Sequence, residues 1–290
     1  MTTPKYPVYI ISKGRWESRQ TVRALEVSGV DFRVVIEPPE YDDYARVINP
    51  DRLLVLPFHD LGQGSIPARN WVWGHATEAG HERHWIIDDN ISGFYRFNRN
   101  LKVRAAAGPC LRAMESFVDR YANVPIAGPN YHMFVKRKEA MSPFRLNTRI
   151  YSCILLSNNP RYASTRWRGK YNEDTDLSLR FLKARECSVL FNAFLIYKAV
   201  TMTMTGGNTD DLYRQDVTFD GRLEMAQSLR RQHPDVVTIT RKWGRWQHSV
   251  DYRPFRCTRL QKRSGVVVPT GIDNFGMSLK TVESRDASRT

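Results

Sequence analysis

Two clusters of acidic side chains are the residues of this chain best suited to chemistry. The first, Asp88-Asp89-Asn90, directly follows the apolar run Trp85-Ile86-Ile87, which predicts a buried strand. Carboxylate and amide oxygens are ligands that Mg²⁺ or Mn²⁺ prefers, and a bound cation can in turn hold a phosphate. The same three residues also suit a plain solvated turn, so this cluster alone leaves both interpretations open.

The second cluster, Asn172-Glu173-Asp174, begins a segment whose apolar residues recur with helical spacing. A carboxylate at the start of a helix, facing a sugar carbon, can remove the proton of an acceptor hydroxyl. Acids in a first helical turn also complement the helix dipole, and Asn172 or Asp174 suits the N-cap position. Local sequence favours capping. The combination with the first cluster is what indicates an enzyme of nucleotide-activated group transfer.

Five further polar residues fall where a nucleotide diphosphate needs contacts. Ser12 and Arg15 follow the first expected strand, and Glu37 ends the second. Arg69 and Asn70 lie near the start of the helix before the first acidic cluster, from which they can reach phosphates or the base. Glu37 can accept hydrogen bonds from ribose hydroxyls. An exposed strand-end acid at Glu37 and a surface salt bridge at Arg69 are the structural alternatives.

Apolar runs and helical patterns alternate in the first half of the chain, which indicates βαβ units. In a parallel sheet, ligands bind beyond the carboxyl ends of the strands, where the residues above fall. We therefore expect an α/β fold with a mainly parallel, Rossmann-like sheet flanked by helices. The expected strands are 7–11, 32–36, 53–56, 85–87, 149–156 and 189–197, and the expected helices begin near residues 18, 41, 67, 110, 174 and 222.

The composition is that of a globular protein of ordinary size. The chain has 290 residues, of which 41% are hydrophobic and 11% aromatic, which excludes a disordered chain. No apolar run approaches the ~20 residues that span a bilayer, and the N-terminus lacks the apolar core of a signal peptide. The four cysteines are scattered without a C-x-x-C pair, so neither disulfides nor a zinc site is expected. We expect a cytoplasmic protein with no membrane partner.

Positive charge is the second strong feature of the sequence. The net charge is +14 and the sequence pI is about 9.8, so the surface attracts polyanions, among which nucleic acid is the usual partner. The segment 241–263 carries eight Lys/Arg against one acid, Asp251, and interleaves aromatic residues such as Trp243 and Trp246. Alternating cations and rings suit phosphate contacts and base stacking. The expected DNA-binding residues in this segment are Arg241, Lys242, Arg245, Arg253, Arg256 and Arg259.

A second basic patch, 161–170, lies just before the second acidic cluster, and its Arg166 and Arg168 are further expected DNA contacts. We expect three regions: a catalytic domain over residues 1–240, a basic aromatic segment over 241–263 that binds the acceptor, and a loosely packed tail over 264–290. His248 is a lone histidine, and most such residues are structural. It matters for the metal only if the C-terminal segment folds back over the first acidic cluster.

Read together, these segments resemble the GT-A fold of metal-dependent glycosyltransferases that use nucleotide sugars. The order and spacing of "SKGR", "VVIEP", "IPARNWVWGHATEAGHERHWIIDDN" and "NEDTDLSLRFLKA" are similar to that superfamily's A-R-N helix, Asp-x-Asp motif and Glu-Asp motif. More narrowly, "IISKGRW", "IIDDN", "YNEDTDLSLR" and "TMTGGN" resemble the TET-associated glycosyltransferases. That family is found largely in bacteriophages and is inferred to glycosylate hydroxymethylated pyrimidines in DNA. The resemblance covers roughly residues 7–210.

The resemblance implies a role for each cluster. Asp88, Asn90 and, as an additional ligand, His248 would hold Mn²⁺ or Mg²⁺, and Asp88 and Asp89 would contact a nucleotide-sugar donor, expected to be a UDP-sugar. Asp174 would be the general base, with Glu173 as its neighbour, which favours inversion at the sugar carbon. Many GT-A enzymes have Asp where this chain has Asn90, which predicts modest metal affinity.

Two alternatives stay open at this stage. One is a GT-A enzyme with a lipid, glycan or small-molecule acceptor, whose basic surface meets an anionic partner or a membrane face. The other is a Mg²⁺-dependent nuclease or DNA-binding protein, in which Asp88, Glu173 and Asp174 serve phosphodiester chemistry. A nuclease has no evident need of the Arg69-Asn70 helix start or of Glu37 at a strand end.

Overall fold

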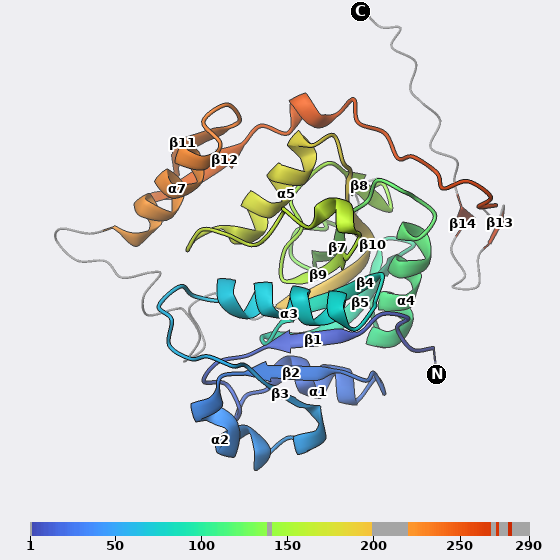
Figure 1. The fold of residues 1–290 in the computed structure, drawn as a ribbon. Helices are drawn as coiled ribbons and strands as arrows, with labels where there is room; N and C mark the ends of the chain where they lie inside the picture. The colour runs from blue at the N-terminus through green and yellow to red at the C-terminus, as the bar shows by residue number, and fades with distance from the viewer. Residues whose placement is uncertain (1, 138–140, 199–219, 268–270, 273–277, 280–290) are drawn as a thin grey trace, which may run out of the picture.

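The structure, a computed structural model, describes residues 2–137, 141–198, 220–267, 271–272 and 278–279. Its helices alternate with strands along the first half of the chain, as expected from the sequence (Figure 1). The "TMTGGN" segment and most of the expected tail lie outside the described residues. The helices are α1 (Gln20–Glu26), α2 (Tyr41–Ala45), α3 (Ile66–Glu78), α4 (Ala107–Val118), α5 (Glu173–Lys183) and α7 (Gly221–Gln232), with short 3-10 turns η1 (Pro38–Glu40), η2 (Pro50–Arg52), η3 (Pro160–Tyr162) and η4 (Arg253–Phe255).

Ten strands form one sheet in the order β3-β2-β1-β4-β9-β7-β10-β5-β6, with β8 also paired to β10. The first four strands in this order are mutually parallel, whereas β9, β5, β6 and β8 run antiparallel to their neighbours. The α/β fold class is therefore confirmed, with a parallel N-terminal half and a mixed C-terminal half. The strands of the sheet are β1 (Val8–Ile11), β2 (Arg33–Ile36), β3 (Leu53–Val55), β4 (Arg83–Asp88), β5 (Ile91–Asn98), β6 (Leu101–Ala105), β7 (Ile126–Tyr131), β8 (Phe144–Leu146), β9 (Cys153–Ser157) and β10 (Ser188–Lys198).

Helices cover both faces of the sheet, and the alternation of side chains along β1 shows how. Val8 and Ile10 pack with α1 and α4 in one core cluster, whereas Tyr9 packs with α3 and α5 in the other. Successive strand residues point to opposite faces, so a strand buried on both sides is apolar throughout rather than alternating. This is why the sequence runs of β1 and β2 predicted buried strands correctly.

The C-terminal part adds a small third core at one end of the molecule. β11 (Val237–Lys242) and β12 (Arg245–Val250) form an antiparallel hairpin that lies beside α7 (Figure 1). Leu179 and Leu182 of α5 pack with Leu229 of α7, Val237 of β11 and Phe255 of η4. The expected boundary at residue 241 falls inside β11, so the basic segment begins within a structured hairpin. After η4 the chain crosses to the end of α4, and β13 (Gly271–Ile272) pairs with β14 (Ser278–Leu279).

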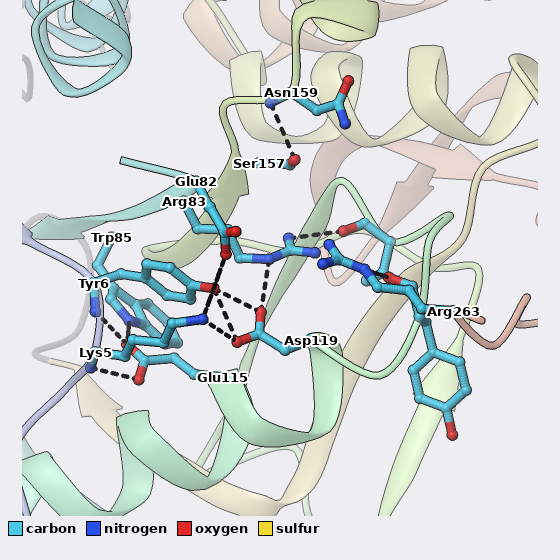
Figure 2. A network of polar contacts seen from close by, with 12 residues as sticks. Lys5, Tyr6, Glu82, Arg83, Trp85, Glu115, Asp119, Ser157, Asn159 and Arg263 are labelled. Atoms are coloured by element: carbon cyan, nitrogen blue, oxygen red, sulfur yellow. Dashed lines mark hydrogen bonds and ion pairs between the residues drawn. The ribbon is translucent and has the colours of Figure 1, made fainter. Parts of the chain in front are cut away.

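A polar network lies at the amino ends of β1 and β4, and it ties the N-terminal segment to α4 (Figure 2). The acidic cluster at Asp88 lies at the other end of β4. The carboxylate of Glu115, which is fully buried, accepts hydrogen bonds from the backbone N–H groups of Lys5 and Tyr6 and from Trp85 Nε1. The Tyr6 hydroxyl lies 2.8 Å from Asp119 Oδ1. Buried polar groups are stable only when they have such partners. This network therefore anchors the start of β1 and leaves its carboxyl end to build the site.

None of the helices within the described ranges is long and apolar enough to cross a membrane.

Candidate active site

The carboxyl ends of β1, β2 and β4 meet at one edge of the sheet, and the predicted donor residues gather there. Ser12 follows β1, Glu37 follows β2, and Asp88 is the last residue of β4. The strands pair in register, with Ile11 opposite Asp88. Side chains separated by up to 77 positions in sequence therefore lie together, as the Ser12 Oγ–Asp89 Oδ2 distance of 2.9 Å shows.

Asp88 is held between two cations. Arg69 Nη2 lies 2.8 Å from its Oδ1, and Lys198 Nζ lies 2.8 Å from its Oδ2. Although burial opposes ionisation, Lys198 and Arg69 hold the pKa of Asp88 well below its ordinary value. An ionised carboxylate with 22% of its side chain exposed is thus fixed at the end of β4. The cations leave a carboxylate face open to a ligand.

Asp89 points to a different set of partners. Its carboxylate lies 2.5 Å from Arg15 Nη1 and accepts a hydrogen bond from the Ser12 hydroxyl. The Asp89 side chain is only 9% exposed. Burial raises the pKa of Asp89 above its ordinary value, even though Arg15 and Ser12 favour the charged form. Asp89 therefore fixes the turn after β1. Its contribution to a donor site is to hold Ser12 and Arg15 in place.

The residues around Asp88 fit a metal ion shared with a ligand, and do not by themselves form a closed metal cage. Among the described residues, no group of three His, Cys, Asp or Glu side chains is arranged to hold a metal, and His248 belongs to no such group. Within the described residues Asn90 Oδ1 is buried and has no hydrogen-bond partner, so it is an oxygen that a bound ion would satisfy. Mg²⁺ is usually held by one or two carboxylates together with substrate phosphates. Asp88 and Asn90 suit that arrangement.

Arg69 is a buried cation that contacts both acidic clusters. Its guanidinium is 6% exposed, lies 4.8 Å over the Trp167 ring and donates from Nε to Ser65 Oγ at 3.0 Å. Besides its bond to Asp88, it has a buried Nη1 with no hydrogen-bond partner in the described part of the chain. A buried, unpartnered guanidinium nitrogen is costly unless a ligand completes it. Because the Arg69 side chain is buried, the alternative interpretation of this residue as part of a surface salt bridge is wrong.

Asn70 has a structural role that was not expected. Its Nδ2 donates to the Trp167 carbonyl at 2.9 Å, and its Oδ1 accepts from the Trp167 N–H at 2.9 Å. Both ends of the amide are therefore used to fasten the 161–170 loop to α3. These bonds use one N–H and one lone pair of an amide that has two of each, so the interpretation of Asn70 as a phosphate or base contact stays a prediction.

Glu37 lies at the predicted strand end, paired with a lysine. Lys13 Nζ is 2.7 Å from its Oε2, and the Asp60 N–H donates to the same oxygen at 3.2 Å. Glu37 is 18% exposed, so it is neither a free surface acid nor fully enclosed. A carboxylate oxygen has two lone-pair directions, and the second oxygen of Glu37 remains available for ribose hydroxyls.

Glu173 and Asp174 begin α5 but face different partners. Glu173 Oε1 lies 3.7 Å from Arg69 Nε and 3.5 Å from the Ser65 hydroxyl, so it belongs to the Asp88 side of the site. Burial raises the pKa of Glu173, against the opposing effect of Arg69. Asp174 Oδ1 accepts the Thr175 N–H at 2.6 Å. One oxygen of Asp174 thus accepts a backbone N–H of the first turn of α5, and the second oxygen takes no part in this hydrogen bond.

Asn172 does not cap α5 with its side chain. It adopts a left-handed backbone conformation, and its Nδ2 donates to the Met225 carbonyl of α7 at 2.9 Å. Asn172 therefore occupies the N-cap position, as one alternative predicted, but its side chain makes no capping hydrogen bond, whereas Asp174 is the second residue of the helix and not its N-cap. The capping role does not exclude chemistry, because a carboxylate carries two oxygens.

The C-terminal hairpin brings His248 to the Asp174 side of the site. His248 Nε2 lies 3.5 Å from Arg149 Nη1. Burial, followed by the charge of Arg149, lowers the pKa of His248 to about 4, although Asp174 favours the protonated form. The hairpin therefore does fold back, and it places a neutral imidazole beside Arg149.

The basic residues of the hairpin are exposed, and so is the aromatic residue at its tip. Trp243 and Gly244 both have positive φ, as a tight two-residue hairpin turn requires, and 87% of Trp243 is exposed. A bulky residue in the left-handed region is uncommon. The turn therefore presents the indole to solvent. The exposed basic residues of this region are Arg241, Lys242, Arg245, Arg253, Arg256 and Arg259.

The second basic patch is tied to the protein. Arg168 makes hydrogen bonds from Nε and Nη2 to Asp176, which is fully buried and also binds Arg180 and His233. Arg166 is half-buried, and its guanidinium lies 5.1 Å over the Trp73 ring. Both arginines thus hold the loop against α3 and α5, which makes them weaker candidates for DNA contact than the hairpin.

Sequence reasoning missed Lys198, Arg149 and the two tyrosines beside them. Lys198 follows a long apolar strand and lies 110 positions from its partner Asp88. Tyr131 and Tyr151 lie with ring centroids 4.3 Å apart, between Lys198 and Arg149. Nothing local distinguishes these residues from ordinary strand-end cations and core aromatics. Only the pairing of β7, β9 and β10 brings them to the site.

Comparison with known protein families gives a match over most of the chain. The model of the TET-Associated Glycosyltransferase family matches residues 6–207. This span contains Asp88, Glu173 and Asp174, and ends before the hairpin. A search of the curated proteins found no match.

Proposed function

This chain belongs to the TET-associated glycosyltransferase family, and we propose that it moves a sugar from a UDP-sugar to a hydroxymethylated pyrimidine in DNA. The observation that carries the proposal is that Arg69 brings the two acidic clusters together, because it contacts both Asp88 at the end of β4 and Glu173 at the start of α5. Asp88 is held ionised between two cations, and Ser178 links the carbonyl of Asp174 to the backbone N–H next to Arg149. One carboxylate thus suits a charged donor and the other suits an acceptor hydroxyl.

On the donor side, three groups would meet the diphosphate. The unpartnered Nη1 of Arg69 donates to a phosphate oxygen, and Lys198 supplies a second positive charge. Asp88 and Asn90 would hold Mn²⁺ or Mg²⁺, and such an ion supplies Lewis-acid stabilisation of the departing diphosphate. Glu37, already fixed by Lys13, accepts from the ribose.

On the acceptor side, Asp174 takes the proton of the hydroxymethyl group. The acceptor oxygen forms a bond to the sugar carbon as the bond between that carbon and the diphosphate oxygen breaks. The nucleoside diphosphate leaves with the bonding electron pair, and the proton stays on Asp174. Attack from the face opposite the leaving group inverts the sugar carbon, and Glu173 beside Arg69 stays on the donor side.

DNA is the proposed acceptor because of where the positive charge lies. The hairpin carries Arg241, Lys242 and Arg245 on exposed positions around the protruding Trp243. A two-stranded ribbon fits the major groove, which is where a 5-hydroxymethyl group projects. Counterion release by the hairpin cations supplies affinity, and the indole supplies a stacking surface.

A two-arm experiment tests the proposal. Duplex DNA with hydroxymethylcytosine or hydroxymethyluracil is incubated with Mn²⁺ and a panel of nucleotide sugars, and a parallel arm contains Mg²⁺ alone. We expect sugar-bearing nucleosides in the first arm and intact DNA in the second. Nicking in the second arm without sugar transfer in the first supports a nuclease. Transfer only to a glycan or lipid acceptor supports the other alternative.

A further inference from the structure

A hollow of about 360 Å³ lies where the C-terminal hairpin meets the catalytic core. Its walls come from segments far apart in sequence: the end of β7 and the loop after it, the loop before β9, and β12 with the residues after it. Its volume is in the range of small-ligand sites. A larger hollow of about 620 Å³ lies between α1 and the β5–β6 hairpin, but none of the described residues that line it has a carboxylate or an imidazole.

Aromatic rings form one corner of the smaller hollow. Phe134 and Tyr151 both line it, with ring centroids 6.3 Å apart and planes at 86°. Tyr151 is buried at 6% exposure, whereas Phe134 is 48% exposed at the surface. A buried ring next to a half-exposed ring gives a flat ligand one fixed wall and one accessible stacking face. Large exposed aromatics of this kind suit a nucleobase.

Polar groups of the lining lie beside this aromatic corner. The Arg149 guanidinium lies 5.1 Å over the Tyr151 ring, and its Nη1 is 3.5 Å from Nε2 of His248. No acidic residue is among the described residues that line the hollow. Guanidinium N–H groups donate to the ring carbonyl that both cytosine and uracil carry. The lining thus suits a neutral ring with oxygen acceptors, attached to an anionic backbone.

Asp174 lies close to this hollow. The N–H of Ile150, next to Arg149 in the lining, donates to Ser178 Oγ at 3.1 Å, and that hydroxyl donates to the carbonyl of Asp174 at 2.8 Å. Oε1 of Glu173, the residue before Asp174, lies 3.7 Å from Nε of Arg69, which binds Asp88. The start of α5 therefore lies between the lining of the hollow and the cations of the donor side. A group held in the hollow and projecting a hydroxyl toward the core meets the carboxylate of Asp174.

We propose that this hollow receives the acceptor nucleobase after it has turned out of the duplex, and presents its hydroxymethyl oxygen to Asp174. Phe134 stacks on the ring and Arg149 holds its carbonyl. The inference rests on the proposed function, since it names where that function's acceptor binds. Extruding a base costs a few kcal/mol, which the stacking and polar contacts in the hollow offset.

Phe134 gives the sharpest test, because a half-exposed ring can be removed with little effect on folding. Phe134→Ala is compared with Phe134→Trp, which keeps a stacking face, and with Met133→Ala. Met133 is the neighbouring residue, is 61% exposed and does not line the hollow. The readouts are the KM for hydroxymethylated DNA, the fluorescence of 2-aminopurine beside the target base, and the thermal unfolding midpoint.

We expect Phe134→Ala to raise the DNA KM by roughly 5- to 150-fold, the range for loss of one stacking contact. It should also remove the fluorescence rise that reports base extrusion, with an unfolding midpoint like that of the parent. Phe134→Trp should restore both, and Met133→Ala should behave as the parent does. If the parent glycosylates DNA and both Phe134→Ala and Arg149→Lys keep its KM and fluorescence, the hollow is not the acceptor site. If the parent transfers no sugar to DNA, the proposed function and this inference both fail.

Discussion

Replacing Asp174 by asparagine removes one negative charge and leaves the shape of the side chain. The amide oxygen can still accept the Thr175 N–H, which lies 2.6 Å from Asp174 Oδ1. The helix loses the favourable effect of an acid in its first turn, about 0.3–1 kcal/mol. Loss of a general base costs about 10²–10⁴-fold in rate, equivalent to about 3–5 kcal/mol of transition-state stabilisation. We therefore expect turnover to collapse while the unfolding free energy changes little.

Asp176, in the same turn of α5, is the matched control. It is fully buried, and its carboxylate binds Arg168, Arg180 and His233. Asp176→Asn removes the buried carboxylate that binds Arg180, whose side chain is 19% exposed, and breaking such a largely buried ion pair costs up to about 3–5 kcal/mol of stability. It touches no group of the proposed reaction. The two variants should thus show opposite patterns, one losing rate and the other losing stability.

The assay combines single-turnover transfer to hydroxymethylated DNA, calorimetric affinity for the nucleoside diphosphate, and chemical denaturation. Asp174→Asn should keep nucleotide affinity within about twofold while its rate falls at least about 100-fold. If Asp174→Asn retains more than a tenth of the parent's rate, Asp174 serves only the helix and the assigned base is wrong. Glu173→Gln, on the donor side, separates the two acids.

Three further outcomes are expected. The affinity of the parent for UDP should rise when Mn²⁺ is added, and the affinity of Asp88→Ala should not. Equal calorimetric affinities of the parent for UDP with and without metal would contradict the shared metal site. Reversing the charges of Arg241, Lys242 and Arg245 should flatten the salt dependence of DNA binding by roughly 0.9 log unit per lost phosphate contact. Reversing the charges of three exposed arginines outside the hairpin, Arg23 in α1, Arg33 in β2 and Arg46 after α2, should leave this salt dependence unchanged. Burial lowers the pKa of the His84 imidazole to about 3 in the folded protein. In the unfolded chain the same imidazole binds a proton below about pH 6.5, so acid favours the unfolded state. The free energy of unfolding should therefore fall as pH falls from 6.5 toward 3. His84→Gln should remove up to about 3 kcal/mol of that loss between pH 7 and 4. Identical pH profiles of the unfolding free energy for the parent and His84→Gln would refute this.

Sequence patterns gave the buried parallel strands and their helices because these obey local rules. The runs around Ile10 and Val35 are apolar on both faces, and Gly29 ends its helix with a positive φ, as only a residue without a Cβ does easily. The acidic pairs at the ends of β4 and at the start of α5 were located for the same reason. Their positions follow from the elements that carry them.

Two hairpins and several site residues could not be predicted from local sequence. The β5–β6 turn places Arg99 and Asn100 at positive φ, and the β11–β12 turn does the same with Trp243, so neither has the usual turn residues on both sides. The strand Arg245–Val250 alternates polar and aromatic residues, which matched a basic loop as well as a strand. The contact of Lys198 with Asp88 depends on the pairing of distant strands, which a periodicity argument does not reach.

The central claim is that this site transfers a sugar to a hydroxymethylated base in DNA. The most direct measurement is the mass of the nucleosides released from hydroxymethylated duplex DNA after incubation with the protein, Mn²⁺ and a nucleotide sugar. The account predicts a hydroxymethyl nucleoside heavier by one sugar residue with the parent, and its absence with Asp88→Ala and with Asp174→Asn. Nucleosides of unchanged mass across the full donor panel, from protein that binds both UDP and DNA, would contradict it.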